Sequence, residues 1–281
     1  VLIVDREFHQ VIGDAVAKLE TPPLLIDVDD PEYGEGEPVS ELDYEAFLAE
    51  GDPEFQWQWP DNEWNAISLN YTSGTTGDPK GVVYHHRGAY LNSLGNQATW
   101  SMGLHPVYLW TLPMFHCNGW TYTWAVTSVG GTHVCLRQTD PAKIFPAIRD
   151  HKVTHMCGAP IVLNMMAHAP DEQKVIFEQN VMVATGGAAP PSAVIATMEE
   201  MGFTVSHQYG LTECYGPSTF CAWQDEWADM SIEKRASKMA RQGVRFPTLF
   251  AQSVLNPETM ETVPDDGETI GELMLCSNTV M

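Results

Sequence analysis

The segment Tyr71–Gly81 has the sequence YTSGTTGDPKG, with four small hydroxyl-bearing residues, three glycines and one lysine in eleven positions. Glycines let the backbone approach a ligand closely, and successive N–H groups in such a loop bind anions. The hydroxyl groups add donors, and a lysine supplies a point charge that suits phosphate. The segment therefore predicts a polyphosphate-binding loop, although a flexible turn between strands has the same composition.

The loop differs from the P-loop pattern G-x-x-x-x-G-K-[ST]. Gly74 and Gly77 are too close together, Pro79 precedes Lys80, and Gly81 follows it. A nucleotide-binding fold of the Ras or ATPase kind is therefore disfavoured.

Composition limits the partners of the chain. The 281 residues are 44% hydrophobic, enough for a sizeable core, and 14 basic against 37 acidic side chains give a net charge of −23. Such a surface repels nucleic acid and anionic membranes on average. No apolar stretch approaches the ~18 residues of a membrane span. Six widely spaced cysteines suit the reduced thiols of a cytoplasmic protein.

Hydrophobic periodicity alternates between strand and helix along most of the chain, which predicts a doubly wound, largely parallel α/β sheet with flanking helices. The first expected unit is strand 1–5, helix 8–19 and strand 23–28, followed by a short helix at 44–49. The later strands are expected at 107–112, 132–136, 153–157, 181–185 and 204–207, and the later helices at 119–129, 142–149, 161–167 and 191–201.

The sequence pattern changes near Gly243. Turn-forming residues and short segments of alternating apolar and polar residues follow from there. We expect residues 1–242 to form an α/β part and residues 243–281 to begin a β-rich subdomain. The chain opens on Val1 without an initiator methionine, and we expect it to be part of a longer protein.

Three further motifs follow the loop in order: PMFHCNGW at Pro113–Trp120, GGAAPPS at Gly186–Ser192 and QYGLTE at Gln208–Glu213. Together with YTSGTTGDPKG they resemble the signatures of the adenylate-forming superfamily. The first of the three narrows the resemblance to acyl-CoA synthetases, and the combination of motifs is most similar to short- and medium-chain ligases of the 3-methylmercaptopropionate–CoA ligase kind. The resemblance implies part of the large N-terminal domain of that family.

The activity that this resemblance implies is AMP-forming acid–thiol ligation. A carboxylic acid and ATP give an acyl-adenylate, and coenzyme A then displaces AMP to form a thioester. ATP, Mg²⁺ and CoA are the implied cofactor and co-substrates. Glu213 and Thr72 would hold Mg²⁺, Tyr209 would stack on adenine, and Thr212 would contact the α-phosphate. The implied nucleotide-binding residues are Thr72, Ser73, Gly74, Thr75, Thr76, Gly77, Lys80, Gly187, Ala188, Gln208, Tyr209, Gly210 and Thr212.

The resemblance also implies an acyl pocket made by His116, Trp120, Trp124 and Gly210. His116 stands where amino-acid-activating relatives have an aspartate, so an amino-acid substrate would lack a partner for its ammonium group. Trp120 and Trp124 are four positions apart, which would place them on one helical face. With His116, the implied catalytic residues are Lys80 and Glu213.

An amino-acid or aryl-acid adenylation domain and an inactive nucleotide-binding module stay open as alternatives. The ribose-binding aspartate and the mobile C-terminal domain with its lysine, which the family uses, have no counterpart that can be located in this chain. We therefore expect the 281-residue segment alone to be inactive. Family members are often homodimers, so that assembly stays open.

Overall fold

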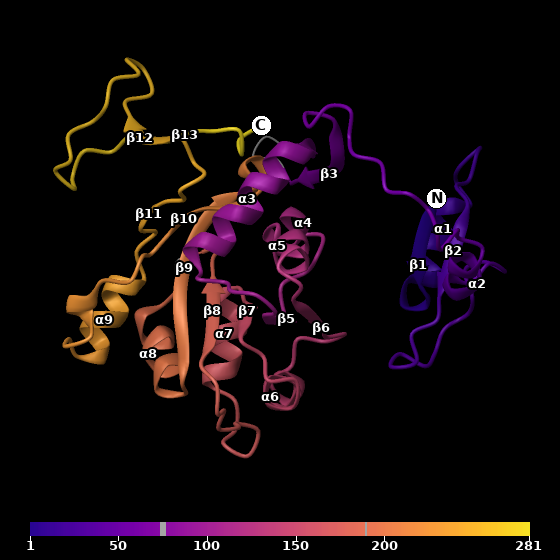
Figure 1. Ribbon diagram of the computed structural model, residues 1–281, viewed down its shortest axis with the longest axis horizontal. Coiled ribbons are helices and arrows are strands. Elements are labelled where there is room, and N and C mark those ends of the chain that lie inside the picture. Colours follow the sequence, from indigo (N-terminus) through magenta and orange to yellow (C-terminus); the bar gives the residue numbers. More distant parts are fainter. Residues whose placement is uncertain (74–76, 189) are drawn as a thin grey trace. The chain divides into compact units, whose positions relative to one another are not determined.

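The structure, a computed structural model, describes residues 1–73, 77–188 and 190–281 and divides into two compact units, Val1–Trp59 and Pro60–Met281. Each unit is described by itself. The motifs of the sequence all lie in the second unit (Figure 1).

The first unit is built around a parallel strand pair. Ile3 on β1 pairs with Ile26 on β2, and the buried Asp27 forms an ion pair with Arg6 at 2.8 Å. The expected β–α–β unit is therefore confirmed, although its helix ends at Val16. The elements are β1 (Leu2–Asp5), η1 (Arg6–Phe8), α1 (His9–Val16), β2 (Leu25–Val28) and α2 (Tyr44–Ala49).

Within the described residues, the largest sheet of the second unit has seven strands in the order β11-β10-β9-β8-β7-β5-β6. The strands from β5 to β9 are parallel, whereas β10 and β11 are antiparallel additions at one edge. The strands are β5 (Val107–Trp110), β6 (Thr132–Cys135), β7 (His155–Cys157), β8 (Val181–Thr185), β9 (Phe203–Leu211), β10 (Gly216–Phe220) and β11 (Val244–Arg245). The expected doubly wound α/β class is confirmed.

Successive strand residues point to opposite faces, and each face has its own helices (Figure 1). On β5, Leu109 joins a core with α6, α7, α8 and α9, whereas Tyr108 and Trp110 join a core with α4 and α5. The helices are α3 (His86–Thr99), α4 (Cys117–Trp120), α5 (Tyr122–Ser128), α6 (Pro141–Asp150), α7 (Pro160–Ala167), α8 (Ser192–Glu200) and α9 (Ile232–Met239), with the short turns η2 (Thr212–Cys214) and η3 (Asp225–Trp227).

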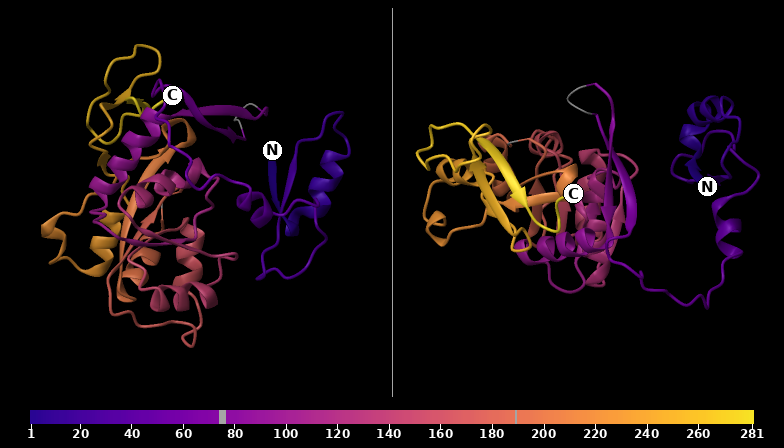
Figure 2. Two further views of the ribbon diagram at one scale, coloured as in Figure 1. Left: turned by 45° about the vertical axis from the view of Figure 1, so that its right-hand side comes forward. Right: turned by 90° about the horizontal axis from the view of Figure 1, so that it is seen from above.

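The phosphate-loop motif belongs to a hairpin of its own, β3 (Ala66–Thr72) and β4 (Lys80–His85), which stands outside the large sheet (Figure 2). A second antiparallel pair, β12 (Ala251–Leu255) and β13 (Glu272–Cys276), follows β11. The boundary expected near Gly243 stays a prediction.

Helix α3 and the hairpin partner β4 have no counterpart among the expected elements. The side of α3 that is buried is made of small and polar residues, so the helix lacks the apolar stripe on which periodicity depends. Its buried residues are Gly88, Ala89, Asn92, Ser93, Gly95 and Asn96.

The single helix expected at 119–129 is wrong at its start. The backbone between Cys117 and Thr121 has positive φ angles, and regular helix begins only at Tyr122. Hydrogen bonds from β3 to Asn118 and close packing of Gly119 against Trp110 hold this irregular turn in place. Asn118 Oδ1 accepts hydrogen bonds from β3, and a Cβ on Gly119 would lie 2.6 Å from the Trp110 ring.

Candidate active site

The hairpin β3–β4 presents the ends of the phosphate-loop motif to a cavity. Thr72 and Lys80 are paired in register where the two strands meet the loop. The expected ligand-binding residues Gly74, Thr75 and Thr76 lie outside the described residues, so their assignment stays a prediction.

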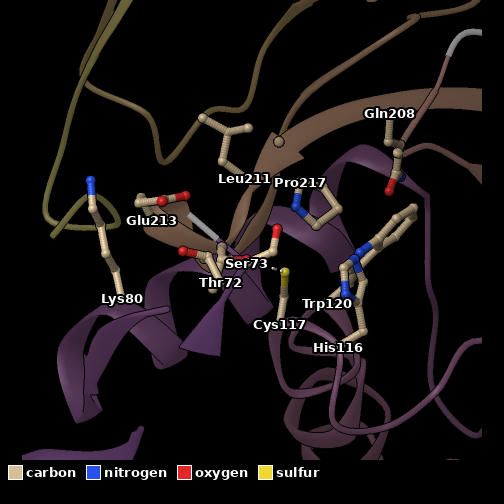
Figure 3. A pocket seen from close by; sticks show the side chains of 14 residues that line it. Thr72, Ser73, Lys80, His116, Cys117, Trp120, Gln208, Leu211, Glu213 and Pro217 are labelled. Carbon is tan, nitrogen blue, oxygen red and sulfur yellow. Dashed lines mark hydrogen bonds between the residues drawn. The ribbon is translucent and has the colours of Figure 1, made fainter. Parts of the chain in front are cut away.

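A cavity of about 530 Å³ lies between this hairpin, the α4 turn and the end of β9. Side chains from all three elements point toward it (Figure 3). Its lining comprises Thr72, Ser73, Lys80, His116, Cys117, Trp120, Gly187, Gln208, Gly210, Leu211, Thr212, Glu213, Gly216 and Pro217.

One end of the cavity is charged. Figure 3 shows Lys80 and Glu213 on the same side, with the hydroxyl of Thr72 beside them. In the part of the chain that the structure describes, neither Lys80 nor Glu213 forms an ion pair. A carboxylate and a hydroxyl are hard oxygen donors that fit Mg²⁺, and an unpaired ammonium fits a phosphate oxygen. This end of the cavity therefore suits a magnesium-bound phosphate chain.

The opposite end is aromatic, with Trp120 buried and His116 exposed. Figure 3 shows Trp120, His116 and Gln208 on the side away from Lys80. Trp120 is 6% exposed, and the Oε1 atom of Gln208 accepts a hydrogen bond from the Tyr122 hydroxyl at 3.2 Å. This end suits a small apolar group.

Close packing explains two glycines, Gly186 beside the cavity and Gly210 in its wall. A Cβ on Gly186 would lie 2.8 Å from the Trp120 ring and 2.5 Å from the carbonyl oxygen of Gln208. A Cβ on Gly210 would lie within van der Waals overlap of the Gly216 backbone. By contrast, a Cβ on Gly187 would meet open space, so there it is the positive φ of 83° that favours glycine.

The hydroxyl of Thr212 points toward the buried thiol of Cys117, with 3.6 Å between Oγ1 and Sγ. Burial raises the pKa of the Cys117 thiol, so the sulfur stays protonated near neutral pH. The sulfur is therefore a polarizable wall atom at the junction of the two ends of the cavity.

The structure does not bring every expected site residue to the cavity. Gly77, Ala188 and Tyr209 are described but do not line it, and Tyr209 pairs with Thr219 on β10. Their assignments stay predictions.

Trp124 lies in the wall of a different cavity. That cavity, of about 490 Å³, is formed by α3, α5 and β3. The expected helical spacing between Trp120 and Trp124 fails because the backbone turn at Thr121, with a φ of 62°, separates the two residues. Trp124 therefore lines a different cavity from Trp120, and its assignment to the acyl pocket stays a prediction.

Sequence reasoning gave no role to three residues that line the cavity, namely Leu211, Gly216 and Pro217. Leu211 lies inside the QYGLTE motif, so its position was available as a signal. Gly216 and Pro217 begin the antiparallel strand β10, which was not expected.

Among the described residues, no helix combines the length and apolar character needed to cross a membrane.

A family model described as "AMP-binding enzyme" matches residues 1–281. The acetate–CoA ligase CCL3 of Humulus lupulus is 46% identical over 295 residues, and the peroxisomal acetate/butyrate–CoA ligase AAE7 of Arabidopsis thaliana is 45% identical over 294. Each match covers 100% of this chain and 52% of the relative. The chain thus spans about half the length of the curated relatives it matches.

Solved structures share the fold. The long-chain-fatty-acid–CoA ligase FadD1 of Archaeoglobus fulgidus superposes with a TM-score of 0.81 at 17% identity, covering 100% of this chain and 54% of that one. The N-terminal domain of FACL13 from Mycobacterium tuberculosis gives a TM-score of 0.77 at 23% identity, covering 100% and 64%.

Proposed function

Because this chain belongs to the AMP-binding enzyme family, we propose that the protein is an AMP-forming acyl-CoA ligase for short carboxylic acids. The acid carboxylate attacks the α-phosphorus of ATP, which gives an acyl-adenylate and releases pyrophosphate. The thiol of CoA then attacks the acyl carbon, forming the thioester and releasing AMP. The observation that carries the proposal is the two-ended cavity, charged beside Lys80 and Glu213 and aromatic beside Trp120.

At the charged end, Lys80 binds the β- and γ-phosphates and Thr212 contacts the α-phosphate. Glu213 and Thr72 would hold magnesium. When bound, Mg²⁺ neutralises the charge that develops on the departing pyrophosphate. The ammonium of Lys80 acts in the same direction because negative charge moves toward it as the P–O bond breaks.

At the aromatic end, His116 holds the carboxylate or the adenylate carbonyl by a hydrogen bond, and Trp120 limits the length of the acyl chain. Gly210 forms part of the wall and, having no side chain, leaves space for the acyl group. The described substrates of the relatives, acetate for one and acetate or butyrate for another, support a short acid. Within this class, 3-methylmercaptopropionate is a candidate because its sulfur matches the polarizable thiol of Cys117.

The remaining nucleotide contacts are proposed on motif position alone. They include stacking of Tyr209 on adenine and backbone contacts from Gly77, Gly187 and Ala188. A cytoplasmic location also stays a prediction, and the relative AAE7 is described as peroxisomal.

The test is acid-dependent exchange of labelled pyrophosphate into ATP by the full-length protein. The acids are acetate, butyrate, 2-methylpropanoate, 3-methylmercaptopropionate, hexanoate, benzoate and one amino acid, each followed by addition of CoA. We expect exchange with the short aliphatic acids and conversion to thioester. Exchange with the amino acid alone would favour an adenylation domain, and ATP binding without any exchange would favour an inactive nucleotide-binding module.

A further inference from the structure

Two stacked tyrosines join the elements that carry the charged end of the cavity. The rings of Tyr84 and Tyr215 have centroids 4.0 Å apart and an angle of 19° between their planes. Both side chains are fully buried, and neither tyrosine lines the cavity. Tyr84 is on β4, the strand that begins with Lys80, and Tyr215 follows η2, which contains Glu213.

Each phenol makes a hydrogen bond to the backbone of the other element. The Tyr84 hydroxyl donates to the carbonyl oxygen of Thr212 at 2.7 Å. The Tyr215 hydroxyl accepts from the N–H of His85 at 2.8 Å. Hairpin and turn are therefore connected by two hydrogen bonds, both donated by the hairpin, and by the ring stack between them.

The surroundings of Tyr215 show that its place is built into the fold. A Cβ on Gly88 would lie 2.4 Å from the Tyr215 ring, so only glycine leaves room there. The Nδ2 atom of Asn92 donates to the Tyr215 carbonyl at 3.1 Å. Tyr215 itself has a φ of 67°, a left-handed conformation that is unfavourable for a residue with a side chain. These contacts keep the residue in that conformation.

Burial raises the pKa of Tyr84 well above its ordinary value. The phenol therefore keeps its proton at neutral pH and above the pH at which an ordinary tyrosine would lose it. The hydrogen bond to Thr212 is thus a permanent donor contact rather than one that titrates.

We propose that Tyr84 and Tyr215 are positioning residues, which hold the phosphate-binding hairpin against the turn that carries Glu213. The separation between Lys80 on the hairpin and Glu213 on the turn then sets the affinity for ATP with magnesium, because the two elements supply the charged side chains of this end. The inference rests on the proposed function for the identity of the ligand. The aromatic end of the cavity comes from the α4 turn, which is attached to β3 through Asn118, so we expect the pair to affect it less than the charged end.

The experiment uses Tyr84→Phe, Tyr215→Phe and the double variant in the full-length protein. Each change removes one hydroxyl and keeps the ring stack. We expect the Kd for ATP with Mg²⁺, measured by titration calorimetry, to rise about fivefold to tenfold in each single variant. We expect the double variant to show less than the product of the two effects, since both hydrogen bonds serve the same junction.

Kinetics separate positioning from general loosening. In pyrophosphate exchange, the KM for ATP should rise while the KM for the acid stays within about twofold. The rate of thioester formation from preformed acyl-adenylate should be unchanged. The matched control is Tyr90→Phe on α3, whose side chain is 65% exposed, and it should bind ATP like the parent.

An unchanged Kd in both single variants overturns the proposal, and so does an equal rise of the two KM values. Thermal unfolding of every variant checks that the fold is retained. Calorimetry needs no turnover, so the role of the pair is judged even if no acid is activated. That outcome would count against the proposed reaction alone.

Discussion

At the scale of single residues, the charged side chains of the cavity are Lys80 and Glu213. A charged side chain acts most strongly on a ligand when no side chain of the opposite charge in the protein neutralises it. Lys80 on β4 faces Thr72 on β3 in the backbone register of the hairpin. In the described part of the chain, its ammonium has no carboxylate within ion-pair distance. The charge is therefore free to act on a ligand.

Replacement of Lys80 by methionine keeps most of the side-chain volume and removes the charge. We expect kcat/KM for ATP in pyrophosphate exchange to fall about 100-fold, because the ammonium stabilises charge that develops on pyrophosphate. Lys143→Met on α6 is the control, since that side chain is exposed and far from the motif in sequence. If kcat/KM fell by a similar factor in Lys143→Met, the loss could not be attributed to the position of the Lys80 charge.

His155 predicts how stability depends on pH. Its ring is 8% exposed against Trp100, with ring centroids 5.0 Å apart, and burial lowers its pKa to about 4. An unfolded histidine has a pKa of about 6.5, so the unfolded state binds the proton first as pH falls. Stability is therefore lost from about pH 6.5 downward until pH approaches 4, by about 2 kcal/mol at pH 5.

Denaturant unfolding at several pH values measures this loss. The variant His155→Phe keeps an aromatic ring beside Trp100 and has no proton to bind. It should show a smaller decrease in the free energy of unfolding between pH 7 and pH 5. Parallel pH profiles for the two proteins would exclude His155 as the cause.

At the scale of elements, an irregular turn forms the acyl side of the cavity where the sequence suggested a helix. The hydroxyl of Ser68 and the amide of Asn70, both on β3, donate to Asn118 Oδ1 at 2.5 and 3.0 Å. Asn118 has a φ of 44°, a region that asparagine tolerates better than most residues. The α4 turn, with His116 and Trp120 at its two ends, is thus tied to the phosphate-binding hairpin.

Asn118→Ala removes both hydrogen bonds and puts a less tolerant residue at positive φ. We expect the free energy of unfolding to fall by about 2 kcal/mol and the KM for the acid to rise, because His116 and Trp120 lose their support. Asn118→Gly removes the same hydrogen bonds without the cost of the left-handed backbone. Comparison of the two variants by denaturant unfolding therefore separates the two contributions, and equal losses would exclude backbone strain as a component.

At the scale of the whole molecule, the second unit brings four separate motifs to one cavity. Side chains pack on both faces of the parallel strands β5 to β9. The hairpin β3–β4, which is not part of their sheet, adds one wall of the cavity. Strand β4 and the turn after β9 meet beside the cavity. There the Tyr84 hydroxyl donates to the carbonyl oxygen of Thr212, a residue far away in sequence. The cavity is therefore a property of the assembled unit.

Local sequence determined the strand and helix pattern of the parallel sheet, since apolar periodicity is written in neighbouring residues. The motifs also predicted that Thr72, Lys80, His116 and Glu213 belong to one site, and all four line the cavity. The tertiary structure alone decided the break before Tyr122, the burial of polar α3 and the separation of Trp124 from Trp120. These depend on contacts between residues distant in the chain, such as Asn118 with β3 or Gly88 with Tyr215, which no local pattern records.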